Sequence, residues 1–301
     1  MVPLLFCVFL VNVEIMLTTK TKVALAGLAY KAISTSRSLV GKDDRATVER
    51  NGIRWFLDLH EGIDFSIYLL GAFEPGTRVT LQKLIEPGDV VFDIGANIGA
   101  HTLGMAQSVG PSGKVYAFEP ADFAFEKLRC NLALNPELAA RTVPRQILFS
   151  AAPTDRAEPE IYASWPLQSA EPVHPKHRGR LVSTTRAIVD TLDAFVDRNT
   201  ITSLNLIKID VDGHELPVFR GATETLRRFQ PTLVMEMSPY IHAERQNNFS
   251  DFVEILKNAG YSLRDADNGS DVPLDVVQLE RLIPDGASIN VVAEPERSSA
   301  L

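Results

Sequence analysis

Short apolar runs alternate along the chain with longer amphipathic stretches. Val90 to Phe92 is such a run, and apolar residues recur at helical spacing from Phe123 to Leu134. Short apolar runs are typical of strands that are covered on both faces. Apolar residues at helical spacing are typical of the helices that cover such strands. We expect strands at 90–92, 114–120, 147–152, 204–209, 231–237 and 289–293, and helices at 100–109, 123–134, 214–226 and 252–259. This alternation predicts an α/β fold.

The chain of 301 residues is long enough for one large domain with additions. We expect that domain over residues 51–295, with an N-terminal extension over residues 1–50. Val2 to Leu17 is strongly apolar, but it lacks a basic start and a cleavage site and is short for a membrane span. We therefore favour a packed extension, or a wrongly assigned start codon, over a membrane-associating segment. Thr18 to Arg50 is expected to form a helical lead-in or a loose linker, and Ile53 to Leu59 a short strand or hairpin.

The turn after the strand at 90–92 carries the candidate cofactor-binding residues. It reads Asp93-x-Gly95-x-Asn97-x-Gly99. A dinucleotide site needs Gly-x-Gly-x-x-Gly with a pyrophosphate at the helix N-terminus, and an acid in the turn would repel that pyrophosphate. The turn therefore favours a cofactor with a cationic or amino-acid end. Glu119, at the end of the second strand, is placed to accept hydrogen bonds from ribose hydroxyls.

Several motifs in order give the chain a resemblance to a known family. They are Gly71–Glu74, Phe92–Gly99, Ala117–Pro120, the helix residues Asn131 and Asn135, and Ile207–Glu215. Over about residues 60–240 the chain resembles the FkbM-type methyltransferases. The resemblance implies a Rossmann-like class I methyltransferase fold, with a seven-stranded, mostly parallel sheet and helices on both faces. It also implies S-adenosylmethionine as the cofactor and a small-molecule or glycosyl hydroxyl as the acceptor. Asp212 stands where the family usually has Glu.

A second group of polar residues follows the strand at 204–209. Asp210, Asp212, His214 and Glu215 stand at its carboxyl end, where ligands of α/β sheets bind. Methyl transfer to a hydroxyl needs alignment of the acceptor and removal of its proton. We expect His214 to be the general base and Asp210 to orient it or to hold the hydroxyl.

Two other interpretations of these acids stay open. Asp210 and Asp212 could ligate Mg²⁺, which prefers carboxylate oxygens and would acidify a bound diol. Alternatively, Asp212 and Glu215 could cap the following helix and complement its dipole. Glu236, inside an otherwise apolar strand, is expected either to be a site residue or to have a structural partner, because a buried carboxylate is costly alone.

The Pro-rich stretch from Pro153 to Arg180 interrupts the alternation of elements. It is either a surface excursion or a flap that faces the acceptor, on which Trp165 could stack. His174 and His177 lie in it, but no further ligands nearby support a zinc site.

Composition narrows the function further. The formal net charge of −8 argues against a nucleic-acid partner. Cys7 and Cys130 are the only cysteines, which excludes a disulfide framework and a Cys-x-x-Cys metal site. We expect a cytoplasmic protein. The sequence does not indicate its oligomeric state. Two rival functions remain, a nicotinamide-dependent oxidoreductase and a non-catalytic domain that retains the cofactor-binding fold.

Overall fold

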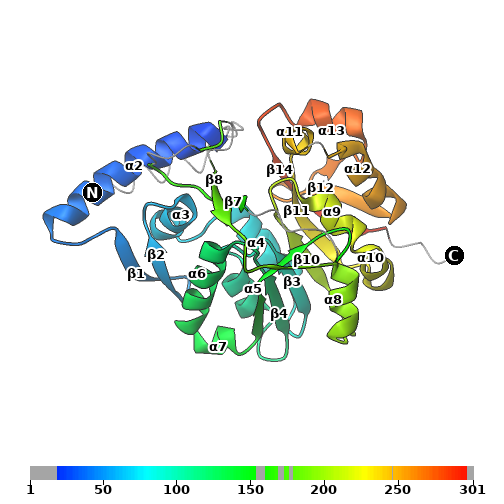
Figure 1. Ribbon diagram of the computed structural model, residues 1–301, viewed down its shortest axis with the longest axis horizontal. Coiled ribbons are helices and arrows are strands. Elements are labelled where there is room, and N and C mark those ends of the chain that lie inside the picture. Colours follow the sequence, from blue (N-terminus) through cyan, green and yellow to red (C-terminus); the bar gives the residue numbers. More distant parts are fainter. Residues whose placement is uncertain (1–18, 154–159, 169–172, 176–178, 246, 297–301) are drawn as a thin grey trace.

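A single large sheet forms the centre of the molecule (Figure 1). The computed structural model describes residues 19–153, 160–168, 173–175, 179–245 and 247–296. The sheet has eight strands in the order β13-β12-β14-β11-β10-β3-β4-β5. Their bounds are β3 Val90–Ile94, β4 Lys114–Phe118, β5 Thr142–Arg145, β10 Leu206–Ile209, β11 Thr232–Met237, β12 Tyr261–Asp265, β13 Asp271–Val272 and β14 Ile289–Pro295.

The sheet is mostly parallel, as expected. Strands β11, β10, β3, β4 and β5 run parallel to their neighbours within this set. Strands β14, β12 and β13 join by antiparallel pairing. The fold class is therefore confirmed, and β13, a strand of two residues at the edge, adds an eighth strand to the seven expected.

One expected strand was placed wrongly. The segment at 147–152 contains only the short strand β6 (Ile147–Phe149), which pairs with β9 (Ile188–Asp190) outside the main sheet. Strand β5 takes the position beside β4 instead. Its sequence, Thr-Val-Pro-Arg, lacks an apolar run and contains Pro144, which an edge strand tolerates because one side of its backbone needs no ladder hydrogen bonds.

Helices cover both faces of the sheet. Alternate residues of one strand face opposite sides, so Phe92 belongs to one hydrophobic cluster and Val91 to the other. The first cluster packs against α8 (Leu192–Arg198), α9 (Glu215–Arg220), α10 (Thr223–Phe229), α12 (Phe249–Asn258) and α13 (Val276–Leu282). The second packs against α2 (Thr19–Leu39), α3 (Gly62–Leu70), α4 (Pro75–Leu84), α5 (Thr102–Ser108) and α6 (Asp122–Ala133). The short helices α7 (Pro136–Ala139) and α11 (Pro239–Glu244) complete the set of described helices.

The single helix expected at 214–226 is two helices. It breaks at Gly221, between α9 and α10. A Cβ atom at Gly221 would lie 2.2 Å from the carbonyl oxygen of Ser150. The chain therefore bends where only glycine allows the backbone to approach the segment after β6.

The N-terminal extension contains more regular structure than its sequence indicated. Helix α2 ends at Leu39, and β1 (Arg45–Arg50) pairs antiparallel with β2 (Ile53–Asp58). The boundary expected after residue 50 thus falls in the turn of a hairpin. In Figure 1, α2 lies along the outer edge of the molecule, above α3 and β1. Val2 to Leu17 lies outside the described residues, and within the described part of the chain no helix is both long and apolar enough to cross a bilayer.

The Pro-rich stretch is partly described. It contains β7 (Glu160–Ser164) and, at its end, β8 (Arg180–Ser183), which pair antiparallel. Glu61, just before α3, accepts hydrogen bonds from Ser164 Oγ at 2.8 Å and from the Trp165 amide at 3.2 Å. The stretch is therefore held against the N-terminal part of the domain.

Candidate active site

A cavity of about 1110 Å³ opens at the carboxyl ends of the parallel strands. Its lining comes from β3, β4, β10 and β11, from α2, α3 and α4, and from the loop after β7. Ligands of open α/β sheets bind at this edge. A single drug-sized ligand occupies a pocket of roughly 300–1000 Å³. The cavity therefore has room for a cofactor and an acceptor together.

The turn after β3 has the backbone that its sequence predicts. Gly95 has a φ of 81° and Asn97 a φ of 48°, both in the left-handed region that Gly and Asn tolerate. The amides of Gly95 and Ala96 both donate to the carbonyl of Phe118, at 3.0 Å. The turn is thereby joined to the end of β4, and Gly95 and Asn97 line the cavity.

The two glycines of this turn have different surroundings. A Cβ atom at Gly95 would lie 1.8 Å from the carbonyl oxygen of Asp210, so the turn packs directly on the end of β10. A Cβ atom at Gly99 would instead lie 2.6 Å from Leu103 Cδ1 and 2.8 Å from Leu128 Cδ1. Gly99 is absent from the cavity lining. Because Gly99 has no side chain, Leu103 of α5 and Leu128 of α6 can pack against the backbone of the turn.

Glu119 lies at the end of β4 and faces the cavity. Its carboxylate accepts hydrogen bonds from the amides of Asn97 and Ala121, both at 2.8 Å. Burial raises the pKa of Glu119 to about 7, against the lowering effect of these two amides. Because each carboxylate oxygen can accept more than one hydrogen bond, Glu119 retains capacity toward the cavity.

Asp93 lies beneath the cavity. It is fully buried, and its Oδ2 accepts a hydrogen bond of 2.6 Å from Thr102 Oγ1. Its Oδ1 lies 3.4 Å from Nζ of Lys208, a residue of β10 that lines the cavity. Asp93 therefore does not face the cavity itself but contacts Lys208, which does.

Lys208 connects the two polar groups that the sequence predicted. Its ammonium donates to the carbonyl of Gly95 at 3.0 Å and lies 3.3 Å from Oδ2 of Asp210. Burial by itself lowers the pKa of Lys208, but the carboxylates of Asp210 and Asp93 outweigh burial and raise it. The sequence analysis assigned no role to this residue, although a lysine within an apolar strand was a usable signal.

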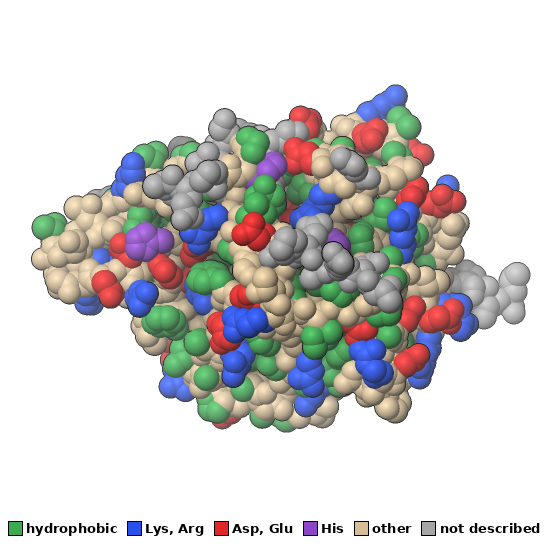
Figure 2. All heavy atoms as spheres, viewed as in Figure 1, with side chains coloured by type: hydrophobic (Ala, Val, Ile, Leu, Met, Phe, Trp, Pro, Cys, Tyr) green, Lys and Arg blue, Asp and Glu red, His purple; other side chains and the backbone are tan. Residues whose placement is uncertain are grey.

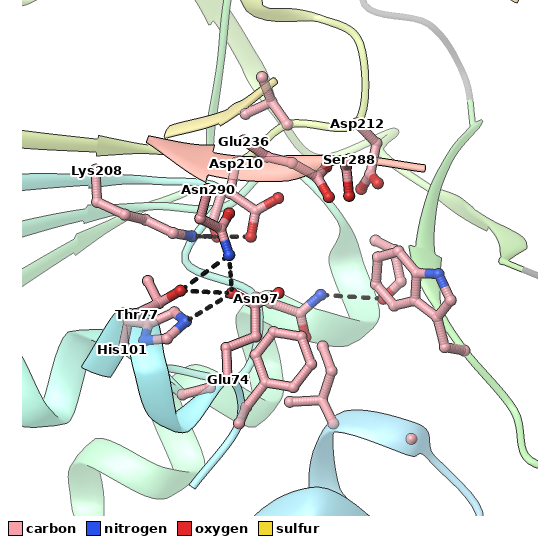
Figure 3. A pocket seen from close by; sticks show the side chains of 18 of the residues that line it. Glu74, Thr77, Asn97, His101, Lys208, Asp210, Asp212, Glu236, Ser288 and Asn290 are labelled. Atoms are coloured by element: carbon pink, nitrogen blue, oxygen red, sulfur yellow. Dashed lines mark hydrogen bonds and ion pairs between the residues drawn. The ribbon is translucent and has the colours of Figure 1, made fainter. Parts of the chain in front are cut away.

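A further polar group joins α4 to β14 across the cavity (Figure 3). Glu74, in left-handed conformation before α4, accepts hydrogen bonds from Thr77 Oγ1 at 3.2 Å and from Asn290 Nδ2 at 3.4 Å. Nε2 of His101 lies 3.8 Å from the same carboxylate oxygen. Although burial raises the pKa of Glu74, the neighbouring His101 and Lys208 hold it below its usual range. Sequence reasoning noted Glu74 only within a family motif and missed His101 and Asn290.

Three acids share the other wall of the cavity. Figure 3 shows Asp210, Asp212 and Glu236 grouped on the same side. Burial raises the pKa of Glu236 to about 8, and the charge of Asp210 adds to this. Burial, with the charges of Asp210 and Glu236, raises the pKa of Asp212 well above its usual range. Strand β10 ends at Ile209 and Asp212 has a φ of 48°, so a turn, and not alternation along a strand, brings Asp212 beside Asp210.

The structure gives no support to the expected magnesium site. In the described ranges, no group of three or more His, Cys, Asp or Glu side chains is arranged to hold a metal ion. Asp210, one of the two expected ligands, is paired with Lys208.

His214 precedes α9 and lines the cavity, as expected. Its Nε2 lies 3.1 Å from the carbonyl oxygen of Phe149. A carbonyl only accepts, so Nε2 carries the hydrogen. Proton transfer at this ring would therefore take place at Nδ1.

Glu215 is absent from the cavity lining. It is buried at the start of α9, where its Oε1 accepts from the amide of Gly213 at 3.2 Å and its Oε2 lies 3.3 Å from His242 Nε2. Burial raises the pKa of Glu215 to about 7 and lowers that of His242 to about 4. No described side chain caps α9, so this placement favours only the other part of that interpretation, in which Glu215 complements the dipole from the first turn of the helix.

Trp165 lines the cavity from the Pro-rich stretch, as the flap interpretation requires. Leu25 and Ala29 of α2 line it as well, together with Phe73. His174 lies 3.2 Å from Glu244, whereas His177 lies outside the described residues. The cavity thus has an acidic wall at the strand ends and an apolar wall formed by the N-terminal part and the flap.

Comparisons with known proteins agree with these features. The family model of the methyltransferase FkbM domain matches residues 93–263. The hexuronic acid methyltransferase AglP of Haloferax volcanii is 30% identical over 154 residues, which cover 50% of this chain and 56% of AglP. The 31-O-demethyl-FK506 methyltransferase FkbM of Streptomyces tacrolimicus is 32% identical over 164 residues, which cover 46% of this chain and 62% of that protein. The chain thus spans less than two thirds of either relative. These matches do not favour the oxidoreductase alternative.

Solved structures show weaker likeness. The methyltransferase FkbM from Methylobacillus flagellatus has a TM-score of 0.41 and 16% identity, covering 69% of this chain and 43% of that one. The TYW2 of M. jannaschii, in complex with AdoMet, has a TM-score of 0.40 and 15% identity, covering 84% of this chain and 86% of that one. At these scores neither structure adds to the argument. The family model, which matches more than half of the sequence and includes the turn, Glu119, Lys208 and Asp210, shows that this chain belongs to the FkbM methyltransferase family.

Proposed function

We propose that the protein transfers a methyl group from S-adenosylmethionine to a hydroxyl oxygen of a small molecule or a glycan. Membership of the family supports the reaction class. The names of the two relatives, a hexuronic acid methyltransferase and a 31-O-demethyl-FK506 methyltransferase, support an acceptor of this kind. The observation that carries the proposal is the hydrogen bond from the Asn97 amide to Glu119, which fixes a carboxylate beside a left-handed turn in the cavity.

The residues of the cavity fit this cofactor. Glu119 suits the ribose hydroxyls, which donate hydrogen bonds to a carboxylate. The apolar side chains of Leu148 and Phe149, beside Glu119 in the lining, suit the adenine. Glu74 suits the ammonium group of the methionine end. Both ring nitrogens of His101 are buried, and the described residues offer neither of them a hydrogen-bond partner, so a polar ligand would satisfy them.

The chain's own residues then prepare the acceptor. The bound cofactor supplies a methyl group on a sulfonium, which a hydroxyl oxygen attacks. Lys208 fixes Asp210, whose carboxylate aligns the hydroxyl by accepting its hydrogen bond. His214 takes the proton at Nδ1, while its Nε2 stays bonded to Phe149. Trp165 and the wall from α2 exclude water from the acceptor.

Calorimetric titration tests the cofactor assignment. S-adenosylmethionine and S-adenosylhomocysteine should bind and NAD should not. Glu119→Gln should weaken both adenosyl ligands by about 10- to 100-fold, because hydrogen bonds to a charged group contribute about 1.5–3 kcal/mol each. Glu137→Gln, at an exposed acid of α7, is the matched control and should leave binding unchanged. Binding of NAD alone would reject the methyltransferase assignment.

A radiolabel-transfer screen tests the chemistry. Candidate sugars and polyketide alcohols are incubated with methyl-labelled S-adenosylmethionine, and transfer is measured for the native protein and for Asp210→Asn and His214→Ala. Each substitution should lower kcat by about 10²- to 10⁴-fold, the range typical of a positioned acid–base group. Unaltered turnover in both variants would refute their roles. Cofactor binding without turnover on any acceptor would favour the non-catalytic alternative.

A further inference from the structure

Helix α2 exposes large apolar side chains on its outer side. Leu28 is 65% and Leu39 is 83% exposed, and Val40, directly after the helix, is 69% exposed. Leu28 and Leu39 are separated by about three turns of helix, so they lie on one side of it. Ala24 and Ala32, one turn before and after Leu28, are exposed too. With the exposed Thr35 between Ala32 and Leu39, these residues form one mostly apolar stripe, which we call the α2 stripe.

The charge around the α2 stripe differs in sign from that of the whole chain. From Ile15 to Lys42 the sequence contains no Asp or Glu, whereas the chain has a net charge of −8. The basic residues of this segment are Lys20, Lys22, Lys31, Arg37 and Lys42. Among those whose side chains are described, Lys31 and Lys42 are exposed. The described part of α2 therefore carries basic and no acidic side chains, and the nearest acids in sequence, Asp43 and Asp44, follow the helix.

A basic hollow lies at the end of the helix, beside Leu39 and Val40. Its volume is about 620 Å³. Its charged lining residues are Arg37, Lys42, Asp43, Arg45 and Arg50. Arg37 and Arg50 donate to the backbone carbonyls of Arg45 and Tyr68, which are uncharged and leave the positive charge of both guanidinium groups in place. The hollow can accept an anionic group such as a phosphate.

The sequence directly before α2 is apolar as well. In Val2 to Leu17, Pro3, Asn12 and Glu14 interrupt an otherwise apolar composition. In Figure 2, the left edge of the molecule, where α2 ends, shows a small green patch among mostly tan atoms, and acidic and basic side chains are interspersed over the visible face. Apolar and cationic character thus coincide in one continuous part of the chain.

We propose that the α2 stripe and the basic hollow dock the protein on an anionic lipid bilayer, with α2 lying in the plane of the interface. An apolar helix face bordered by Lys and Arg binds membranes by burying apolar area and by attraction to anionic headgroups. Binding to a protein partner would not require α2 to lack acidic residues, whereas binding to an anionic bilayer favours it. Ala26, about 160° around α2 from Leu28, lines the cavity together with Leu25 and Ala29, so docking places one wall of the cavity beside the bilayer. This docking was not favoured by the sequence of Val2 to Leu17 alone, because the exposure of Leu28 and Leu39 appears only in the structure.

Sedimentation of the full chain with lipid vesicles tests the proposal. Vesicles of phosphatidylcholine alone are compared with vesicles containing a third phosphatidylglycerol, at low and high salt. The protein should bind the anionic vesicles and be released by salt, since screening weakens attraction between exposed charges. Lys31→Glu with Lys42→Glu should reduce partitioning by about 25-fold or more, because each basic residue near an anionic surface contributes a factor of about five. Leu39→Ser with Val40→Ser should also reduce it.

Matched variants control for general effects of charge and exposure. Lys83→Glu with Lys257→Glu changes two exposed lysines on α4 and α12, and Ile188→Ser changes an exposed apolar residue of β9. These should bind vesicles as the native protein does, and thermal unfolding should show that every variant is folded. Absence of binding to anionic vesicles would overturn the proposal. Equal binding by the α2 variants would overturn it too, as would a change in solution mass on Leu39→Ser with Val40→Ser, which would indicate a second copy of the chain as the occupant.

Discussion

Nζ of Lys208 lies 3.4 Å from Oδ1 of Asp93, and both side chains are buried beneath the cavity. The pair stands on two neighbouring parallel strands, at the directly paired positions of β10 and β3. Lys208 also holds Asp210 and the Gly95 carbonyl. One cation therefore fixes the turn after β3 and the carboxylate of Asp210 relative to each other.

Lys208→Met should destabilise the protein strongly. Removal of one partner of a buried ion pair leaves the other charge uncompensated, at a cost of about 3–5 kcal/mol. Urea unfolding measures this free energy. Asp93→Asn combined with Lys208→Met should recover part of the loss, and Lys83→Met, at an exposed lysine, should cost close to nothing. A double variant no more stable than the single one would argue against direct coupling of Lys208 with Asp93.

Gly95→Ala should disrupt the turn. Its Cβ atom would lie 1.8 Å from the Asp210 carbonyl oxygen, and alanine disfavours a φ of 81°. We expect a loss of at least about 1–3 kcal/mol in unfolding free energy together with loss of cofactor binding. Gly104→Ala, in α5, is the matched control, because its Cβ atom would meet nothing within 4 Å. It should be neutral or stabilising, and equal effects of the two substitutions would contradict this explanation.

Cofactor affinity should rise as the pH increases through about 7. Burial raises the pKa of Glu119 to about 7, and the ionised carboxylate is the stronger acceptor for ribose hydroxyls. Binding should therefore lower that pKa and release protons. Titration of S-adenosylhomocysteine in buffers of different ionisation enthalpy measures the released protons. Glu119→Gln should remove this dependence, and if the variant retained it, the titrating group would lie elsewhere.

The unliganded protein should lose stability as the pH rises from about 5 to about 8. Burial raises the pKa of Asp64 to about 6, those of Glu119 and Glu215 to about 7, and that of Glu236 to about 8. In this window the folded state retains protons that the unfolded state has released, so unfolding becomes more favourable with rising pH.

His242 acts in the opposite direction. Its pKa is lowered to about 4, so the stability that its neutral form contributes is lost as the pH falls from about 6.5 toward 4. Thermal unfolding across the range measures the balance. With these four acids, and Asp212 whose pKa burial also raises, against one imidazole, Tm should be higher near pH 6 than near pH 8, and Glu236→Gln should flatten the slope. A Tm that rises over the same range would show that these carboxylates are ionised in the folded state.

The part of the cavity around the turn after β3 followed from local sequence. Gly95, Asn97 and Glu119 belong to one strand–helix–strand unit, and the bond from the Asn97 amide to Glu119 spans only 22 residues. The geometry of such a unit is narrowly fixed, because adjacent parallel strands end at the same edge of the sheet. The class of fold, the turn and the position of Glu119 were predictable for this reason. The same reasoning could have identified Lys208, because a cation inside an apolar strand needs a buried partner.

The positions of the other residues around the cavity were decided by tertiary structure. The hydrogen bond from Asn290 to Glu74 joins residues 216 positions apart, and the bonds from Ser164 to Glu61 join residues 103 apart. No local pattern connects such residues, because their proximity depends on how the antiparallel edge and the N-terminal hairpin pack around the sheet. The replacement of the segment at 147–152 by β5 likewise depended on which strand could pair with β4. The sequence by itself therefore determined the fold class and the cofactor turn, whose geometry is set within one unit, while the walls of the cavity and the exposed side of α2 were set only by packing between distant segments.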